Sequence, residues 1–292
     1  MAIDRTVLKD IQAKAGTTAD GYWGPNTLKA VAACLKCGAT VKDIQRKVGV
    51  AADGIVGPAT LRAIAASLGT EHSPTPGTVF LDPGHTSDYA REHPSQFKNT
   101  DWTSGRPAEV LQILGITRST DDSIEHVLNV RIAASVQDHL TRKGHSVVVY
   151  DNPSLSNNAE IRQAYTRSNA IGPDAFVSIH NNAQGGSKWE SLGGSASGTV
   201  GLYNVKSARN KILAKALADK VNAYRKATYG PNNRAGTLME SSVGVLSNAK
   251  ASIPAALVEV GFYDNLDDLF WMVTHLDGIG KALAEAIHDT IS

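Results

Sequence analysis

The feature that most constrains this chain is an internal repeat near its N-terminus. Residues 9–35 align with residues 42–68 at an offset of 33, and 17 of the 27 aligned positions are identical. Each copy contains an Asp-Gly pair suited to a tight turn, because glycine tolerates positive φ. A Gly-Pro pair follows, and proline is favoured at the first position of a helix. Each copy is therefore predicted to form two helices, and the two copies to bury one shared core.

A linker separates this repeat from the rest of the chain. Residues 69–77, GTEHSPTPG, combine proline, glycine and hydroxyl residues without hydrophobic periodicity, which is typical of a linker. Residues 1–70 carry nine basic and five acidic residues, whereas the remainder carries 20 basic and 23 acidic. We therefore expect a small, mildly basic all-α repeat domain at 1–70 and a mildly acidic larger domain at 78–292.

The overall composition excludes several classes of protein. A formal net charge of +1 over 292 residues gives no electrostatic reason to expect a nucleic-acid partner. Two cysteines cannot form a disulfide framework, and no run of 18 apolar residues predicts a membrane span. The opening residues, MAIDRTVLKDIQAK, lack the basic head and apolar stretch of a signal peptide. We expect a monomer made in the cytoplasm, with no membrane insertion.

The larger domain alternates short apolar runs with helical patterns. The predicted strands are 78–82, 146–150, 174–180, 198–203 and 255–260, and the predicted helices are 123–142, 210–224 and 276–291. This alternation predicts an α/β fold with a parallel or mixed sheet covered by helices. In such sheets, functional groups gather beyond the carboxyl ends of the strands.

Polar residues with catalytic chemistry stand at three of these strand ends. His85 follows the first strand, His180 ends the third, and Glu259 ends the last, while Glu125 begins a predicted helix. Two imidazoles and a carboxylate with an open position form a catalytic zinc site, and a second carboxylate can act as the base. The long separations leave the alternative that these are ordinary hydrogen-bonded polar residues.

The repeats themselves resemble a known module. The segments LKDIQAKAGTTADGYWGPNTL and VKDIQRKVGVAADGIVGPATL resemble the helical peptidoglycan-binding domain of bacterial and phage cell-wall hydrolases. The resemblance implies that residues 1–70 bind peptidoglycan, with a helical scaffold or dimerisation module as the alternative. Tyr22 and Trp23, beside the first turn, are candidates for stacking on sugar, although a tryptophan in a small helical domain is often part of the core.

The larger domain resembles the zinc-dependent N-acetylmuramoyl-L-alanine amidases of the amidase-3 type. The segments LDPGH, IEHVLNVRIA, SIHNNA and PAALVEVGFYDN correspond to that family's four signature blocks and occur in its order, and NNRAG at 232–236 matches the approach to the last block. The resemblance implies a twisted mixed sheet flanked by helices. It also implies Zn²⁺ held by His85, Glu125 and His180, with Glu259 as the catalytic carboxylate and Asn182 as a candidate substrate-binding residue.

One departure from the family pattern concerns the second ligand. The family has a short gap between the first histidine and the metal-binding glutamate, whereas 40 positions separate His85 from Glu125 here. The intervening insertion, residues 86–124, contains Glu92, His93 and Glu109. We therefore keep Glu109 and His93 as alternatives to Glu125, and we expect the insertion either to shape the substrate pocket or to be a surface elaboration.

Together these resemblances imply a peptidoglycan hydrolase that cleaves the amide between N-acetylmuramic acid and L-alanine of the stem peptide. We expect a phage endolysin that waits in the host cytoplasm before release and then acts at the bacterial cell wall. A secreted autolysin is the alternative for its biological role. The alternative activities are a zinc peptidase acting on the stem peptide and a catalytically inactive wall-binding protein.

Overall fold

The computed structural model describes residues 5–50, 52–70, 77–86, 100–116, 124–152, 154–184, 192–231 and 237–291. The chain separates into two compact units, Met1–Thr75 and Pro76–Ile291. Buried apolar side chains form one cluster in the first unit and two clusters in the second. Each unit therefore has a hydrophobic interior of its own.

The N-terminal unit consists of four helices, two from each copy of the repeat, as predicted. The first copy forms α1 (Arg5–Lys14) and α2 (Pro25–Leu35), and the second forms α3 (Val41–Lys47) and α4 (Pro58–Leu68). Both α2 and α4 begin at the predicted proline. Leu8 and Ile11 of α1 share one buried cluster with Ile44, Leu61 and Ile64 of the second copy, so the two copies do bury a common core.

A buried glutamine in each copy makes the same set of hydrogen bonds and gives several of the identical positions a common structural role. The side-chain amide nitrogen of Gln12 donates to Asp20 Oδ1, the Tyr22 carbonyl oxygen and Thr27 Oγ1, and its oxygen accepts from the backbone N–H of Gly21. Each bond is 2.8 or 2.9 Å long. The same four bonds recur 33 residues later around Gln45, with Asp53, Ile55, Thr60 and Gly54.

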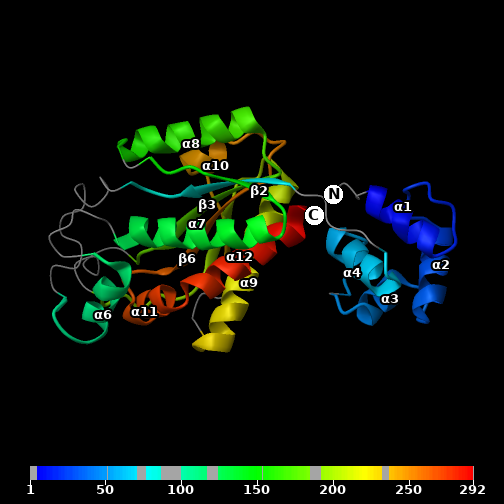
Figure 1. The fold of residues 1–292 in the computed structure, drawn as a ribbon, viewed down its shortest axis with the longest axis horizontal. Coiled ribbons are helices and arrows are strands. Elements are labelled where there is room, and N and C mark those ends of the chain that lie inside the picture. The colour runs from blue at the N-terminus through cyan, green and yellow to red at the C-terminus, as the bar shows by residue number, and fades with distance from the viewer. Residues whose placement is uncertain are drawn as a thin grey trace. The chain divides into compact units, whose positions relative to one another are not determined.

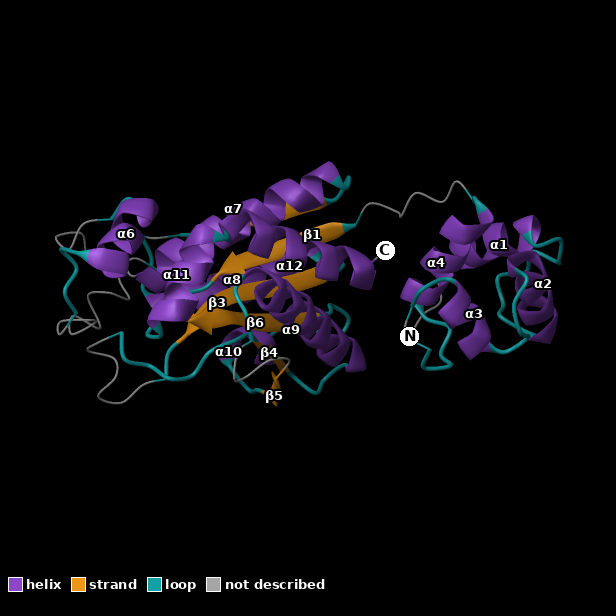
Figure 2. Ribbon diagram, turned by 90° about the horizontal axis from the view of Figure 1, so that it is seen from below, coloured by secondary structure: helices purple, strands orange, loops and turns teal. Residues whose placement is uncertain are grey.

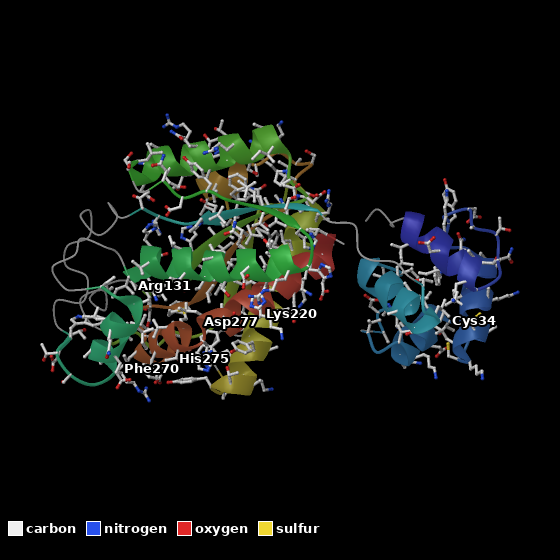
Figure 3. The ribbon with its side chains drawn as sticks, viewed as in Figure 1. Cys34, Arg131, Lys220, Phe270, His275 and Asp277 are labelled. Carbon is white, nitrogen blue, oxygen red and sulfur yellow. The ribbon has the colours of Figure 1, made fainter. Side chains whose placement is uncertain are left out.

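The aromatic pair beside the first turn is divided between core and surface. Trp23 packs against the apolar core, whereas the side chain of Tyr22 is 60% exposed. The equivalent residue of the second copy, Ile55, is 63% exposed. Cys34 and Cys37 are free thiols, and Cys34 is exposed on α2 (Figure 3).

The larger unit is built on a six-stranded mixed sheet, as expected. In chain order its strands are β1 (Thr78–Pro83), β2 (Ser146–Val149), β3 (Ala175–Asn182), β4 (Val200–Tyr203), β5 (Thr237–Glu240) and β6 (Ala255–Phe262). Their spatial order is β2-β1-β3-β6-β4-β5. All neighbouring pairs are parallel except β4 and β6, which are antiparallel. The carboxyl ends of β1, β3 and β6 therefore meet at one edge of the sheet.

Helices cover both faces of this sheet (Figures 1 and 2). The helices α7 (Ile124–Arg142), α9 (Ala208–Thr228) and α12 (Leu276–Ile291) pack with one another on one face, and α8 (Asn157–Ile171) and α10 (Gly244–Ser247) lie on the other. Side chains alternate along β1 accordingly, since Val79 and Leu81 join the larger apolar cluster and Phe80 joins the smaller one.

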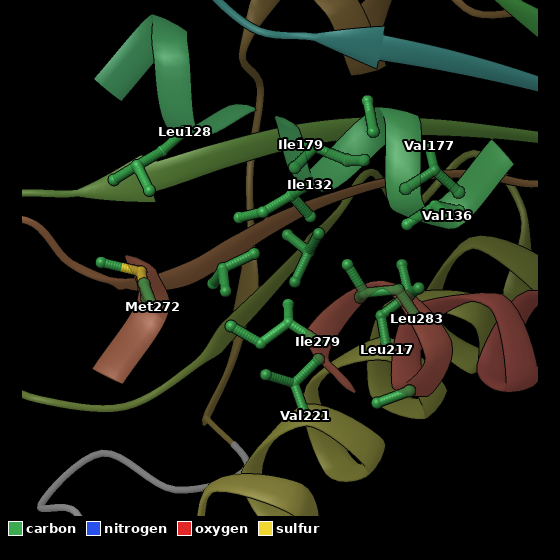
Figure 4. Close-up of a cluster of buried hydrophobic side chains, with 14 of the residues drawn as sticks. Leu128, Ile132, Val136, Val177, Ile179, Leu217, Val221, Met272, Ile279 and Leu283 are labelled. Atoms are coloured by element: carbon green, nitrogen blue, oxygen red, sulfur yellow. The ribbon is translucent and has the colours of Figure 1, made fainter. Parts of the chain in front are cut away.

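The larger cluster fixes α7 and α12 on the sheet (Figure 4). Leu128, Ile132 and Val136 of α7 recur at helical spacing and are fully buried together with Val177 and Ile179 of β3. Burying one such side chain contributes about 1.5–3 kcal/mol relative to leaving it exposed. Because Glu125 lies on the same helix, this packing also determines where its carboxylate is placed.

The described part of the insertion is packed against the domain. It contains α6 (Gly105–Leu114), which lies beside α11 (Leu266–Thr274). Arg131 of α7 donates to the Ile113 and Leu114 carbonyl oxygens at the end of α6, at 2.9 and 2.7 Å (Figure 3). Arg106 of α6 pairs with Asp267 of α11 at 2.7 Å. Residues 100–116 are thus held to the fold, and residues 87–99 and 117–123 lie outside the described ranges.

The structure adds elements that the apolar pattern does not predict. These are the short strand β5 and the helices α6, α8, α10 and α11. The helix α8 buries only a few residues, among them Glu160 and Ser168, so its sequence carries little hydrophobic periodicity. No described helix combines the length and apolar character needed to cross a membrane.

Candidate active site

Four side chains predicted from the sequence lie at the sheet edge where β1, β3 and β6 end. His85 is the second residue after β1, His180 lies near the end of β3, and Glu259 lies in the second half of β6. Glu125 is the second residue of α7. The parallel pairing of the three strands brings these residues, which are far apart in the sequence, to one place.

Three of these residues place donor atoms around a common point. Glu125 Oε1 lies 3.3 Å from His85 Nε2 and 3.3 Å from His180 Nδ1. One ligand atom from each of the three residues lies within 4.8 Å of the others. Among the described residues, this is the only group of three or more His, Cys, Asp or Glu side chains with such spacing. Two imidazole nitrogens and one carboxylate oxygen form a donor set suited to zinc.

The turn that carries His85 has little spare room. A Cβ atom at Gly84 would lie 2.0 Å from His180 Nε2, so only glycine fits between the two histidines. His85 itself has a φ of 65°, the left-handed region that is unusual for a residue with a side chain. The Gly84 backbone is held on both sides, because its N–H donates to the Ile179 carbonyl oxygen and its own carbonyl oxygen accepts from Asn129 Nδ2.

A pair of buried asparagines connects the ligand-bearing elements. Asn181 donates from its side chain to Asn129 Oδ1 at 2.7 Å and from its backbone N–H to Glu125 Oε1 at 3.2 Å. The parallel register of β3 and β6 shifts between His180 and Asn182, and this irregularity accompanies the turn of Asn181 toward α7. Asn181 was not singled out from the sequence, although its position inside SIHNNA was a usable signal.

Glu125 and His180 each stabilise the charged form of the other. Burial alone raises the pKa of Glu125, but the charge of His85 and hydrogen bonds to both histidines lower it to about 2. Burial lowers the pKa of His180, but the hydrogen bond to Glu125 and the charges of Glu259 and Glu125 raise it to about 9. The site therefore holds an ionised carboxylate that attracts cationic partners.

Glu259 lies beside His180, and one of its carboxylate oxygens accepts no hydrogen bond from the described residues. It pairs in register with His180 across β3 and β6. Its Oε2 atom is buried and has no hydrogen-bond partner among the described residues. Burial raises the pKa of Glu259; the charge of His180 lowers it and that of Glu125 raises it, and the result is about 7. A carboxyl group with a pKa near neutrality can both accept and return a proton.

Asn182, the candidate substrate-binding residue, is the last residue of β3 and follows the shift in the pairing of β3 with β6. It lies opposite Phe262 of β6, is half-buried, and its carbonyl oxygen accepts from the Tyr263 N–H at 2.8 Å. The backbone at Asn182 is thus fixed two residues beyond His180. This places Asn182 at the same sheet edge as the histidines.

The outer nitrogen of His85 has a partner that the sequence did not suggest. His85 Nδ1 lies 3.2 Å from Asn157 Oδ1, at the first residue of α8. Asp82 of β1 accepts a hydrogen bond at 2.7 Å from Ser178 Oγ, on the adjacent strand β3.

The insertion offered other candidates for the second metal ligand, and the one that the structure describes lies away from the two histidines. Glu109 is exposed on α6, whereas Glu125 is buried between the two histidines. Glu92 and His93 lie outside the described residues, as does the segment 232–236. Of the acidic candidates that the structure describes, only Glu125 is within reach of His85.

Comparisons with known proteins agree with this architecture. No curated protein matches the sequence at a significant level. Among solved structures, the N-acetylmuramoyl-L-alanine amidase from Clostridium difficile 630 superposes with a TM-score of 0.50 at 24% identity, covering 74% of this chain and 95% of that chain. Cwp6 from Clostridium difficile gives a TM-score of 0.51 at 23% identity, covering 82% of this chain and 34% of that chain.

These structural likenesses show a shared fold. The family itself is shown by sequence, because residues 79–289 match the family described as N-acetylmuramoyl-L-alanine amidase, of the amidase-3 type. That match spans β1 to α12 and includes all the residues that converge at the sheet edge. The chain therefore belongs to the N-acetylmuramoyl-L-alanine amidase family, whose members hydrolyse peptidoglycan.

Proposed function

We propose that this amidase works with a zinc ion held by His85, Glu125 and His180. The observation that carries the proposal is the pair of 3.3 Å separations from Glu125 Oε1 to the two histidine nitrogens. Ligand atoms 2.0–2.1 Å from a tetrahedral zinc ion lie about 3.3–3.4 Å apart. Both separations from the Glu125 carboxylate thus match the spacing of zinc ligands, and all three donor atoms lie within 4.8 Å of one another. Three protein ligands would leave one position open for chemistry.

The residues around the site suit hydrolysis of an amide. Bound zinc would polarise the scissile carbonyl and lower the pKa of a water molecule from 15.7 to about 7. The unpaired oxygen of Glu259 takes the proton of the attacking water. Glu259 then returns that proton to the amino group of L-alanine as it leaves N-acetylmuramic acid. We assign Asn182 to substrate binding, since its amide can pair with the peptide groups of the stem.

Product analysis tests the reaction. Hydrolysis by the amidase releases stem peptides with a free L-alanine amino end and leaves unsubstituted muramic acid. A stem-peptide endopeptidase, the alternative activity, would leave muramic acid substituted. Mass spectrometry of fragments released from purified walls separates the two, and release of no fragments by zinc-loaded protein would support the inactive wall-binding alternative.

We further propose that residues 1–70 hold the enzyme on peptidoglycan. Two observations support this function: the unit has its own core, and the turns of its two copies present exposed Tyr22 and Ile55 at equivalent positions. A tether of this kind raises the effective concentration of enzyme at an insoluble polymer without a new catalytic contact. Residues 1–70 should sediment with walls, and residues 78–292 should cleave soluble fragments but lose activity on intact walls. Failure of 1–70 to sediment with any wall would contradict this assignment.

For the biological role we propose a monomeric endolysin. It accumulates in the host cytoplasm and reaches the wall after release, with a secreted autolysin as the alternative. Expression in a host with and without a membrane-pore protein distinguishes these roles. An endolysin lyses the host only when the pore is present, whereas an exported autolysin acts without it. Light scattering of the purified protein tests the monomer.

A further inference from the structure

The first turn of α8 approaches the metal centre from the side of the sheet opposite α7. Asn157 is the first residue of α8, and its Oδ1 atom lies 3.2 Å from His85 Nδ1. Glu125, on α7, lies 3.3 Å from the other ring nitrogen, Nε2. The imidazole of His85 is therefore held between two helices that cover opposite faces of the sheet (Figure 1).

The chemistry of the two groups fixes the direction of this hydrogen bond. The side-chain oxygen of an asparagine can only accept a hydrogen bond, so His85 Nδ1 must be the donor. A neutral imidazole has one N–H, and with that proton on Nδ1 the lone pair is on Nε2. Nε2 is the atom that faces Glu125 Oε1. The contact with Asn157 thus selects the tautomer that presents a lone pair to the proposed ion.

The position of Asn157 indicates a role beyond starting a helix. The residue that precedes α8, Ser156, makes no side-chain capping bond, so the helix begins without a side-chain cap. Asn158 is exposed, whereas Asn157 is half-buried against His85. The backbone of His85 also lies in the left-handed region, a conformation that persists only where surrounding contacts hold it.

We propose that Asn157 is a positioning residue that fixes the tautomer and ring orientation of His85 for metal binding. The inference rests on the proposed zinc site. Groups that hold the second nitrogen of a metal-binding histidine typically contribute 10–100-fold to metal affinity or activity. The sequence does not predict this contact, because Asn157 reaches His85 only through the docking of α8 on the sheet.

The test compares three variants of the full chain. Asn157→Ala removes the acceptor, Asn157→Asp keeps an acceptor oxygen at the same reach, and Asn158→Ala is a matched control on the exposed side of the same turn. Zinc affinity is measured by competition with a chromophoric chelator. We expect Asn157→Ala to bind Zn²⁺ about 10–100-fold more weakly, and Asn157→Asp and Asn158→Ala to stay within a few-fold of wild type.

Nitrogen NMR of the zinc-loaded wild-type protein reads the tautomer directly, and the same measurement on Asn157→Ala gives the comparison. We expect His85 to carry its proton on Nδ1 and the metal on Nε2, and the Nδ1 proton to exchange faster with solvent in Asn157→Ala. Zinc bound through Nδ1 of His85, or unchanged zinc affinity in a folded Asn157→Ala, would overturn this inference and leave the proposed function standing. Failure of the wild-type chain to bind zinc would instead overturn the proposed function.

Discussion

His180 and Glu259 occupy the same register position on the adjacent parallel strands β3 and β6. Neighbouring strands lie about 4.8 Å apart, so backbone hydrogen bonds fix the spacing between the proposed metal ligand and the proposed base. Both residues come from strands whose flanking positions are buried. The base is therefore positioned by the two central strands of the sheet, and its burial there raises its pKa to about 7.

Replacing Glu259 by glutamine should separate catalysis from metal binding. Glutamine keeps the size of the side chain but cannot accept the proton of the attacking water. We expect kcat to fall on the order of 10²–10⁴ while zinc binds stoichiometrically and the protein stays folded. Glu240→Gln, a change at an exposed carboxylate, is the control and should leave kcat unchanged. Turnover near the wild-type level in a zinc-loaded Glu259→Gln protein would refute the role of Glu259.

Removing a ligand should abolish zinc binding and activity together. We expect this result for His85→Ala, His180→Ala and Glu125→Ala, because two remaining protein ligands hold a divalent ion poorly. Metal content after dialysis and activity on soluble fragments provide the two measurements. His139→Ala is the control. His139 lies near the other end of α7, where it pairs with Asp277 of α12, so its removal should leave zinc binding unchanged. Full zinc occupancy in any one of the three variants would remove that residue from the ligand set.

The sequence predicted much of this sheet because its central strands are buried on both faces. Such strands appear as short apolar runs, and the runs at 78–82, 174–180 and 255–260 correspond to β1, β3 and β6. The polar residues ending these runs then converge, since parallel strands share their carboxyl edge. The short strand β5 was missed because half of its four residues are exposed, which leaves no apolar run.

The supporting contacts could not be predicted in this way. Asn157 reaches His85 only because α8 docks on the sheet, and the few buried residues of α8 include polar ones such as Glu160. A helix whose buried positions are partly polar has no clear hydrophobic stripe. The partner of Asp82 was likewise set by strand register, which brings Ser178 beside it.

Glu160 should make the stability of the protein depend on pH. It is fully buried on α8, and burial, reinforced by the nearby charge of Asp82, raises its pKa to about 9 from 4.5. Between these values the folded state retains a proton that the unfolded state has lost. The free energy of unfolding should therefore fall as pH rises from about 5 to 9, by up to about 1.4 kcal/mol per pH unit.

Glu160→Gln should reduce this dependence, because glutamine has no proton to lose. The raised pKa values of His180 and Glu259 retain the rest of the slope. Urea unfolding of metal-free protein at pH 5, 6, 7 and 8 measures the effect, and the variant should be the more stable protein at pH 8. Glu240→Gln should keep the wild-type slope, since Glu240 is exposed. Parallel slopes for wild type and Glu160→Gln would mean that Glu160 is ionised in the folded state.

A buried ion pair holds the end of β6 in place. Asp268 Oδ1 accepts from Arg225 Nε and Nη2 at 3.0 and 2.8 Å, and both side chains are almost fully buried. Asp268 Oδ2 accepts from the backbone N–H groups of Gly198 and Phe262. One carboxylate thus connects α9, the segment before β4 and the last residue of β6.

Asp268→Ala should therefore destabilise the protein far more than the same change at its neighbour. It leaves the Arg225 guanidinium buried without its carboxylate and removes the acceptor from two backbone N–H groups, at a cost of about 3–5 kcal/mol. Asp267 pairs with Arg106 at the surface and its side chain is 64% exposed, so Asp267→Ala should cost about 0–1 kcal/mol. Denaturant unfolding of the two variants measures the difference. Equal losses would show that Arg225 finds a substitute partner, such as the Gly230 and Pro231 carbonyl oxygens that already accept from its Nη1.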